Sequence, residues 1–505
     1  MKRLFFIILL SILLDEIHSQ EINFIEDSLV SYIDTGMKKW NVPGLGILII
    51  KDGEVIIKRG FGYRDLEKKL TFNPETSFFI ASNTKLFTST MISNLIFQGK
   101  LNINDRVKYF FPNFQLNNPT NTQQVTLSDL VSHRIGTDEF QGDFTYWNST
   151  LSRKDIMYKM RMMKADYIFR QDFGYCNSCY LTAGEIAAKI ARVSWEKYIT
   201  DSLFIPLGML HSSATSNDAE LKFKNLATPY TINYRGELSI LPFDKWDNLG
   251  PAAGIISNLN DMEKWLRFQL DSGKVNGNTL LPWAVLEYTR KARAIISSRY
   301  NSDHKTHFEA YGMGLFMCDF NGNKVYWHTG GASGMVSNVC FVPEKNLGIV
   351  IFTNNDEQGF FENLRLQILD YYLGIPFKNI SEKELPSHLD HLQNERKRVE
   401  DLYARTRKLK NIPNLSQYTG KYTNPQYGEI NVQQKGEYLE INFEHHPKLK
   451  GKLQQLDKGQ WLLSYNNVGY GIFPTSFKSI NGKMVSLDIW VKDYIEYGSY
   501  KFRKK

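Results

Sequence analysis

Cysteine is scarce in this sequence, because its 505 residues contain only four. Four cysteines are too few for a disulfide framework in a chain of this length. Cys176 and Cys179 form a C-x-x-C pair, a pattern that redox and metal sites share. No second ligand pair of suitable spacing lies nearby, so we predict no metal site. A local disulfide remains an alternative, and we favour plain buried thiols.

Long apolar runs are also missing after the N-terminus, as are internal repeats and low-complexity tracts. The run Leu4 to Leu14 follows Lys2 and Arg3 and precedes a polar stretch that ends at Ser19. It is too short for a permanent membrane span and is typical of a secretory signal. We therefore predict a signal peptide over residues 1–19, no transmembrane anchor, and a secreted or periplasmic protein.

The excess of charge is small, with 61 Lys and Arg against 53 Asp and Glu, a formal net charge of +8. Such an excess is typical of a solvated surface, and it could also favour cell-wall polymer or a membrane surface. No recognition motif accompanies the basic residues, so we predict no nucleic-acid partner. The sequence does not indicate an oligomeric state.

The order of the apolar patterns predicts an α+β fold for residues 20–376. Residues 46–65 form a hairpin pattern, several amphipathic helical segments follow, and strand patterns return at 311–320, 323–330, 337–343 and 347–354 before a last helix near 360–374. We expect an antiparallel sheet, assembled from both ends of this domain, with helices packed on it.

The composition changes after residue 376. Residues 377–413 are charged and weakly helical, which predicts a linker. Residues 414–505 contain roughly eight short runs of strand pattern separated by turns, which favours a small antiparallel β-barrel. The chain, 42% hydrophobic, is long enough for two such domains.

A Ser-x-x-Lys pattern stands ahead of an apolar helical run, at Ser82 and Lys85. Such a serine is commonly only a helix N-cap, and the second occurrence, Ser194 and Lys197, has that interpretation. Chemistry would require a base, a partner for the base and amide donors. Lys85 lies on the same helix face as Ser82, and its pKa would have to fall about three units from ~10.4 before it could act as the base.

Two further motifs supply the missing groups: Tyr175-Cys176-Asn177, and His328-Thr329-Gly330-Gly331 at the end of a predicted strand. With these three motifs in this order, residues 25 to 375 resemble the serine penicillin-recognising superfamily. Its members include class C β-lactamases, D-Ala-D-Ala carboxypeptidases, D-aminopeptidases and family VIII esterases. The resemblance implies a β-lactamase/transpeptidase-like fold and no metal or organic cofactor.

The resemblance also implies roles for the motif residues. Ser82 would be the acylated nucleophile and Lys85 its base partner, while Tyr175 would be the second proton-transfer group or the base itself. Asn177 would bind the substrate amide. The N–H groups of Ser82 and Gly331 would form the oxyanion hole, with His328, Thr329 and Gly330 on the same substrate-binding strand. We expect only a structural role for His133.

His328 stands where β-lactamases usually have lysine. A histidine with a pKa near ~6.5 is mostly neutral at pH 7, so a permanent cation for a substrate carboxylate is missing. We therefore expect a serine hydrolase for small esters or peptide amides, including peptides that contain D-amino acids. A β-lactamase or D-Ala-D-Ala carboxypeptidase is the enzymatic alternative, and a non-catalytic binding or scaffold protein that retains the fold is the other.

The C-terminal stretch SQYTGKYTNPQYGEINV is similar to the lipocalin-like domain DUF3471, which follows this type of hydrolase domain in many bacterial proteins. The similarity implies that residues 414–505 cover or edge the active-site cleft and limit substrate size.

Overall fold

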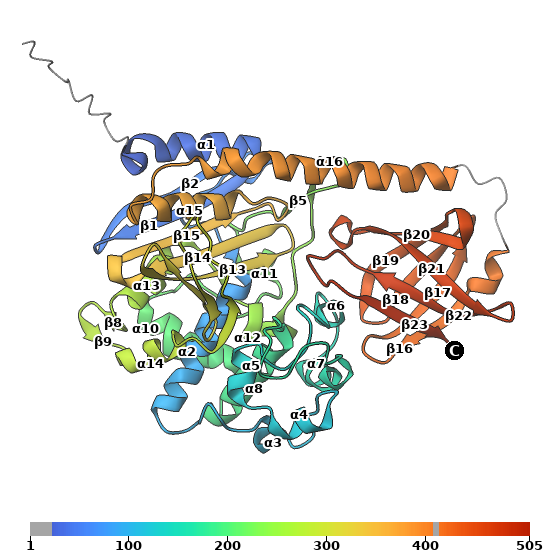
Figure 1. Cartoon of the computed structure of the whole chain (residues 1–505), viewed down its shortest axis with the longest axis horizontal. Helices are drawn as coiled ribbons and strands as arrows, with labels where there is room; N and C mark the ends of the chain where they lie inside the picture. The colour runs from blue at the N-terminus through green and yellow to red at the C-terminus, as the bar shows by residue number, and fades with distance from the viewer. Residues whose placement is uncertain (1–22, 408–413) are drawn as a thin grey trace, which may run out of the picture.

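The computed structural model describes residues 23–407 and 414–505, so the predicted signal peptide lies outside the described residues. Two bodies stand side by side, and helix α16 (Ile380–Arg407) runs along the top of both (Figure 1). We call residues 23–376 the N-terminal domain and residues 414–505 the C-terminal barrel. The described part of the chain has no helix that combines the length and the apolar composition needed to cross a bilayer.

The N-terminal domain is built on a nine-stranded sheet in the order β10-β11-β12-β13-β14-β15-β1-β2-β3. All its neighbouring strands are antiparallel. The strands are β1 (Gly44–Lys51), β2 (Glu54–Asp65), β3 (Leu70–Thr71), β10 (Ala294–Ser297), β11 (Glu309–Tyr311), β12 (Phe316–Phe320), β13 (Asn323–Ala332), β14 (Met335–Val342) and β15 (Leu347–Thr353). The predicted sheet, assembled from both ends of the domain, is confirmed.

Both faces of the sheet are covered, which explains why β1 is apolar at nearly every position. Leu45, Ile47 and Ile49 pack in one core with residues of α1 (Leu29–Lys39) and α15 (Phe360–Tyr372). Leu48 and Ile50 belong to the larger core on the other face. That core includes residues of α2 (Thr84–Phe97), α8 (Asn177–Ala191), α9 (Trp195–Ile199), α13 (Leu259–Leu270) and α14 (Trp283–Thr289).

Strand β13 has a free edge at its C-terminal end. Its neighbour β12 pairs with it only as far as Trp327, while β14 pairs with it to Ala332. Within the described residues, the segment 328–332 therefore has a strand partner on one side only. The other side faces the turn η2 (Ala81–Asn83), which leads into α2, and this arrangement positions the candidate site.

The C-terminal barrel is closed and has eight antiparallel strands, as the spacing of short runs predicts. They are β16 (Gly420–Asn424), β17 (Gly428–Lys435), β18 (Tyr438–Phe443), β19 (His446–Gln455), β20 (Gln460–Tyr465), β21 (Ile472–Ile480), β22 (Lys483–Trp490) and β23 (Ser499–Lys504). Closure leaves no sheet edge exposed.

The charged segment 377–413 contains one continuous 28-residue helix, α16. Near its start, the Trp40 indole nitrogen donates to Ser381 Oγ at 2.8 Å. Near its end, Leu402 packs with Leu456 and Leu462 of the barrel. The helix thus contacts both domains.

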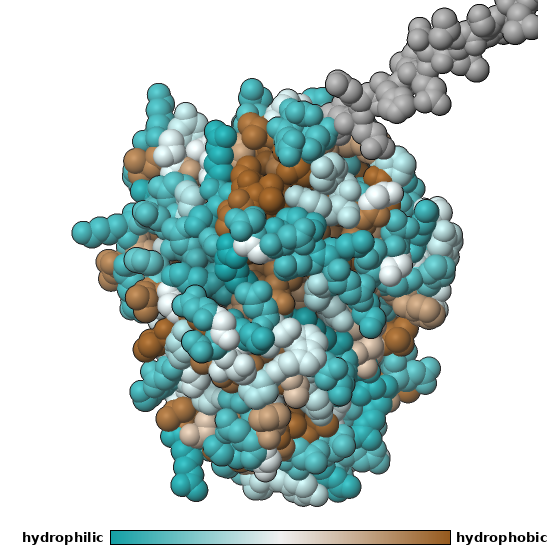
Figure 2. All heavy atoms as spheres, turned by 90° about the vertical axis from the view of Figure 1, so that its left-hand side faces the viewer, coloured by the Kyte–Doolittle hydropathy of each residue, from teal (hydrophilic) through white to brown (hydrophobic). Residues whose placement is uncertain are grey.

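The four cysteines are free thiols, so buried thiols at Cys176 and Cys179 are confirmed and a local disulfide is wrong. Within the described ranges, no group of three or more His, Cys, Asp or Glu side chains is arranged to hold a metal ion. The face of the N-terminal domain that points away from the barrel is mostly hydrophilic, with one group of apolar side chains near its upper middle and smaller groups at the left edge and toward the bottom (Figure 2).

Candidate active site

Ser82 lies in the turn η2 that leads into α2. The preceding residue, Ala81, has a φ of +46°, a conformation that is strained for a residue with a Cβ. Ser337 on β14 holds this turn, because its hydroxyl donates to Ile80 O at 2.7 Å and accepts from Asn83 Nδ2 at 2.8 Å. No side-chain cap is formed at the start of α2, so Ser82 is not an N-cap.

Lys85 is completely buried and contacts three oxygen atoms. Its Nζ lies 2.9 Å from Ser82 Oγ, 2.7 Å from Asn177 Oδ1 and 3.0 Å from the carbonyl oxygen of Ala252. Burial lowers the pKa of Lys85 to about 7, and the carboxyl group of Asp143 opposes part of this shift. A substantial fraction of Lys85 is therefore unprotonated at neutral pH.

Tyr175 lies beside this pair, with its ring centroid 4.9 Å from Lys85 Nζ. Burial raises the pKa of the phenol well above its usual value, and the nearby Ser82 side chain opposes this rise only in part. Tyr175 is consequently a neutral phenol, whose hydroxyl can both donate and accept a hydrogen bond.

Asn177 is the first residue of α8 and connects Lys85 to an acid. Its Oδ1 accepts from Lys85, while its Nδ2 donates to Asp143 Oδ2 at 2.6 Å. The other oxygen of the Asp143 carboxyl group is buried and has no hydrogen-bond partner in the described structure. Burial raises the pKa of Asp143 well above its usual value.

His328 faces the site from β13 and is neutral. Its Nδ1 lies 2.7 Å from the carbonyl oxygen of Thr329, which can only accept, so Nδ1 carries the proton and Nε2 accepts from the Tyr311 hydroxyl at 3.1 Å. Burial, followed by the charge of Lys85, lowers the pKa of His328 to about 3.

The two glycines after Thr329 allow close approaches on opposite sides of β13. A Cβ at Gly330 would lie 2.1 Å from the carbonyl oxygen of Ile80, in the turn that carries Ser82. A Cβ at Gly331 would lie 2.5 Å from the hydroxyl of Tyr494, a residue of the C-terminal barrel. Neither position has room for a side chain without a movement of its neighbour.

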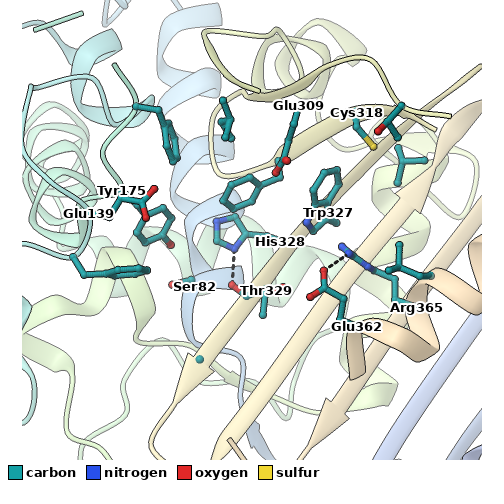
Figure 3. Close-up of a pocket in the computed structure, with 18 of the residues that line it drawn as sticks. Ser82, Glu139, Tyr175, Glu309, Cys318, Trp327, His328, Thr329, Glu362 and Arg365 are labelled. Atoms are coloured by element: carbon teal, nitrogen blue, oxygen red, sulfur yellow. Dashed lines mark hydrogen bonds and ion pairs between the residues drawn. The ribbon is translucent and has the colours of Figure 1, made fainter. Parts of the chain in front are cut away.

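A cavity of about 770 Å³ opens over Ser82. Ser82, Tyr175 and His328 lie together at one end, with Glu139 beside Tyr175, and the ion pair of Glu362 and Arg365 lies at the other end (Figure 3). The predicted residues Asn177, Thr329 and Gly331 also line the cavity, whereas Lys85 and Gly330 lie behind its wall. The structure thus brings together all eight residues that the motifs predict.

The described lining of the cavity is rich in acids. Arg365 supplies a guanidinium group, which is already paired with Glu362 at 2.8 Å. The carboxyl groups are those of Glu139, Asp143, Glu309, Glu362 and Asp493.

Three lining residues come from the C-terminal barrel: Asp493, Tyr494 and Tyr497. The Tyr494 hydroxyl donates to the carbonyl oxygen of Ala332 at the end of β13, at 2.9 Å. The barrel therefore edges the cavity. These three residues, like Glu139 and Asp143, belong to no sequence motif, so the sequence alone does not identify them as part of the site.

The remaining two candidates from the sequence have structural roles. Ser194 caps α9, because its Oγ accepts from the backbone nitrogen of Lys197 at 3.2 Å. His133 Nδ1 accepts from the backbone nitrogen of Cys176 at 3.0 Å, and its ring stacks on Tyr175. Its role as a structural partner is confirmed.

Comparison with known proteins gives two family matches. Residues 29–372 match the Beta-lactamase family model, and residues 405–503 match the domain of unknown function DUF3471. A similar curated protein is Protein flp of Staphylococcus aureus (strain MRSA252), 28% identical over 354 residues that cover 68% of this chain and 67% of that one. Another is Unguisins hydrolase ungD of Aspergillus violaceofuscus (strain CBS 115571), 25% identical over 67% of this chain and 63% of that one.

A solved structure shows the same fold over nearly the whole chain. It is the octameric penicillin-binding protein homologue from Pyrococcus abyssi, with a TM-score of 0.59, 24% identity, and coverage of 94% of this chain and 99% of that one. The Beta-lactamase model matches well over half of the chain. The motifs that contain Ser82, Tyr175 and His328 meet at one cavity. The chain therefore belongs to the beta-lactamase family and carries a C-terminal DUF3471 domain.

Proposed function

We propose that this protein is a serine hydrolase that forms an acyl-enzyme at Ser82. The observation that carries the proposal is the 2.9 Å contact between Ser82 Oγ and the Nζ of Lys85, a fully buried lysine whose pKa is lowered to about 7. A hydroxyl group beside an unprotonated amine forms a pair in which the hydroxyl is the nucleophile and the amine is the base. The name of the relative Unguisins hydrolase supports the same class of reaction.

In the acylation step, the Ser82 hydroxyl proton moves to Lys85 Nζ while Oγ forms a bond to the substrate carbonyl carbon. The carbonyl oxygen becomes an oxyanion, which the backbone N–H groups of Ser82 and Gly331 bind. The bond to the leaving group then breaks, and the proton passes to that group through Lys85 or the Tyr175 hydroxyl. Water attacks the ester in the same manner and releases the acid and Ser82.

Lys85 is the better base of the two candidates. The pKa of Lys85 is lowered toward neutrality, whereas the pKa of Tyr175 is raised well above its usual value. A phenolate at Tyr175 would cost free energy in this buried position, so we assign Tyr175 to relaying the proton as a neutral phenol.

The cavity favours substrates whose acyl group has no carboxylate. His328 stays neutral because its pKa is about 3, and even without the buried Asp143 the lining has more carboxyl groups, at Glu139, Glu309, Glu362 and Asp493, than guanidinium groups. An acyl group that is neutral or carries an ammonium group suits this lining better than the carboxylate of a β-lactam. We therefore propose small esters and peptide amides as substrates, including D-amino-acid peptides such as those of cell-wall material.

We also propose that the protein is exported, on the basis of the signal pattern in residues 1–19. Mass spectrometry of the protein recovered from the exported fraction of its native cells should give a chain that begins near residue 20. An uncleaved chain confined to the cell interior would contradict this assignment.

The decisive experiment is intact mass spectrometry after exposure to a fluorophosphonate probe. We expect one adduct on the wild-type protein and on Ser194→Ala, the matched serine of the second Ser-x-x-Lys pattern, and none on Ser82→Ala. A folded wild-type protein without an adduct would refute the hydrolase proposal and favour the alternative of a binding or scaffold protein. Rapid turnover of a cephalosporin, faster than that of neutral esters, would favour a β-lactamase.

A further inference from the structure

One short segment of the N-terminal domain lies between the Lys85 network and the interior of the barrel. Helix α6 (Asp143–Tyr146) begins with two residues whose side chains contact different parts of the protein. Asp143 contacts Asn177, which in turn contacts Lys85. Phe144, fully buried, packs among aromatic rings of the barrel at centroid distances of 4.9 to 6.1 Å; these belong to Tyr427, Phe443, His446, Tyr470 and Tyr500.

The barrel also holds the backbone on both sides of Asp143. Glu496, in the loop between β22 and β23, accepts from the backbone nitrogen of Gly142 at 2.9 Å through Oε1 and from that of Phe144 at 3.1 Å through Oε2. The Tyr500 hydroxyl donates to the same carboxylate at 2.8 Å. Both carboxylate oxygens are thus used, and the two N–H groups that flank Asp143 are fixed.

A histidine anchors the end of the segment. His446 Nε2 donates to the carbonyl oxygen of Trp147 at 2.7 Å, because a carbonyl can only accept. Its Nδ1 is then the acceptor for the Tyr427 hydroxyl, at 2.7 Å. Residues 142–147 are therefore held by the barrel at their beginning, at Phe144 and at their end.

The position of Asp143 determines the orientation of the Asn177 amide group. With Asp143 Oδ2 as the acceptor, Nδ2 of Asn177 faces the acid and Oδ1 faces Lys85. An amide that rotated by half a turn would place a donor against the amine of Lys85. Correct orientation of Asn177 thus keeps Lys85 Nζ directed at Ser82.

We propose that the barrel contributes to catalysis through Glu496. Glu496 is a positioning residue that acts on Lys85 through Asp143 and Asn177. The inference rests on the proposed function of Ser82 and Lys85. Phe144 fills the space between the aromatic rings of the barrel, so the segment cannot shift toward the barrel without losing that packing.

The test uses Glu496→Gln in the full chain. The substitution replaces one acceptor oxygen by an NH₂ group, which then faces a backbone N–H, and we expect the rate of fluorophosphonate labelling of Ser82 to fall about tenfold. The matched control is Lys492→Gln, which breaks the ion pair with Glu357 at the same domain interface without touching residues 142–147. The control should label at the wild-type rate, and an equal loss in both variants would overturn the proposal.

A double-mutant cycle tests whether Glu496 acts through Asp143. Asp143→Asn should itself slow labelling, and adding Glu496→Gln to it should cause little further loss. Independent losses that multiply, or an Asp143→Asn variant that labels normally, would show that the relay does not exist.

A third readout needs no catalysis. The groups that face Lys85 are Asp143, Cys176, Tyr175, Tyr180, His133 and His328, and the attraction of Asp143 is the first of those that raise the pKa of Lys85. In ¹⁵N-lysine NMR on the Ser82→Ala background, Asp143→Asn should therefore move the Lys85 titration to lower pH, and Glu496→Gln should move the titration as well, because Glu496 acts on both the position and the ionisation of Asp143. An unchanged titration would refute the inference, while a missing wild-type adduct would refute only the proposed function.

Discussion

Tyr311 and His328 form a buried hydrogen bond, with 3.1 Å between the phenol oxygen and Nε2 of the imidazole. Since Nδ1 donates to the carbonyl oxygen of Thr329, this contact leaves the imidazole uncharged at the position where the resemblance to β-lactamases implies a lysine. The side of the site that would meet a substrate carboxylate is thus neutral.

Replacing His328 by lysine should change the substrate preference. We expect His328→Lys to raise kcat/KM for a carboxylate-bearing β-lactam about tenfold relative to a neutral ester, because a charged hydrogen bond contributes more than a neutral one. Steady-state kinetics with one cephalosporin and one p-nitrophenyl ester measures the ratio. His328→Gln is the uncharged control, and a ratio that changes equally in both variants would contradict the argument.

Lys85 should make the stability depend on pH. Its pKa is about 7 in the folded protein and ~10.4 in an unfolded chain. Between these values only the unfolded chain binds the proton, so the contribution of Lys85 to the free energy of unfolding falls as the pH falls from about 10 to 7 and is constant below that. Lys85→Met should remove this slope and stabilise the protein at pH 7 by roughly 1 to 3 kcal/mol.

Urea denaturation of wild type and Lys85→Met at pH 7 and pH 9.5 measures this difference. Lys197→Met is the control, because Lys197 belongs to the other Ser-x-x-Lys pattern and its side chain is 62% exposed. Parallel pH dependences in wild type and Lys85→Met would show that Lys85 stays protonated in the folded state.

The two glycines of β13 should respond differently to alanine. At Gly330 the added Cβ would meet the backbone of Ile80 at 2.1 Å, so the Ser82 turn has to move. We expect Gly330→Ala to cost about 1 to 3 kcal/mol of stability and most of the labelling of Ser82. Thermal denaturation and probe labelling measure both effects.

At Gly331 the nearest atom is the end of the Tyr494 side chain, at 2.5 Å, which can swing away. Gly331→Ala should therefore fold with nearly wild-type stability and label slowly. Adding Tyr494→Ala should restore part of the labelling rate, and a double variant as slow as Gly331→Ala would place the obstruction elsewhere.

The charge of the acyl group should matter for turnover. We expect an aminoacyl p-nitroanilide with a free ammonium group to exceed its N-succinyl analogue in kcat/KM by about tenfold, and the difference to shrink at high salt. Kinetics at about 0.05 M and about 0.5 M salt tests this, with a neutral N-acetyl analogue as the reference. Preference for the succinyl compound would contradict the acid-rich lining as a selectivity element.

The sequence predicts the reactive centre better than its surroundings. Ser82 and Lys85 share a helix face, and Asn177 and His328 stand in motifs, so the order of the three motifs and the family that they resemble identify these residues. The eight-stranded barrel follows from the alternation of apolar and polar residues along short runs, whereas the central strands of the sheet are marked by short, continuously apolar runs.

What the sequence does not predict depends on contacts between distant residues. Glu496 meets Gly142 across 354 positions, and no local pattern in either segment indicates the pairing. The same holds for Tyr494 at the end of β13. A single sequence records which residues are apolar or polar, but not which surfaces of two domains fit together.

Helix α16 has a consequence for the strength of the contact between the domains. At 1.5 Å per residue its 28 residues extend about 42 Å, and it packs on both domains. A tether of this kind makes docking intramolecular, with an effective concentration on the order of millimolar. The interface around Phe144 can then be too weak to join two separate chains and still be occupied in nearly every molecule.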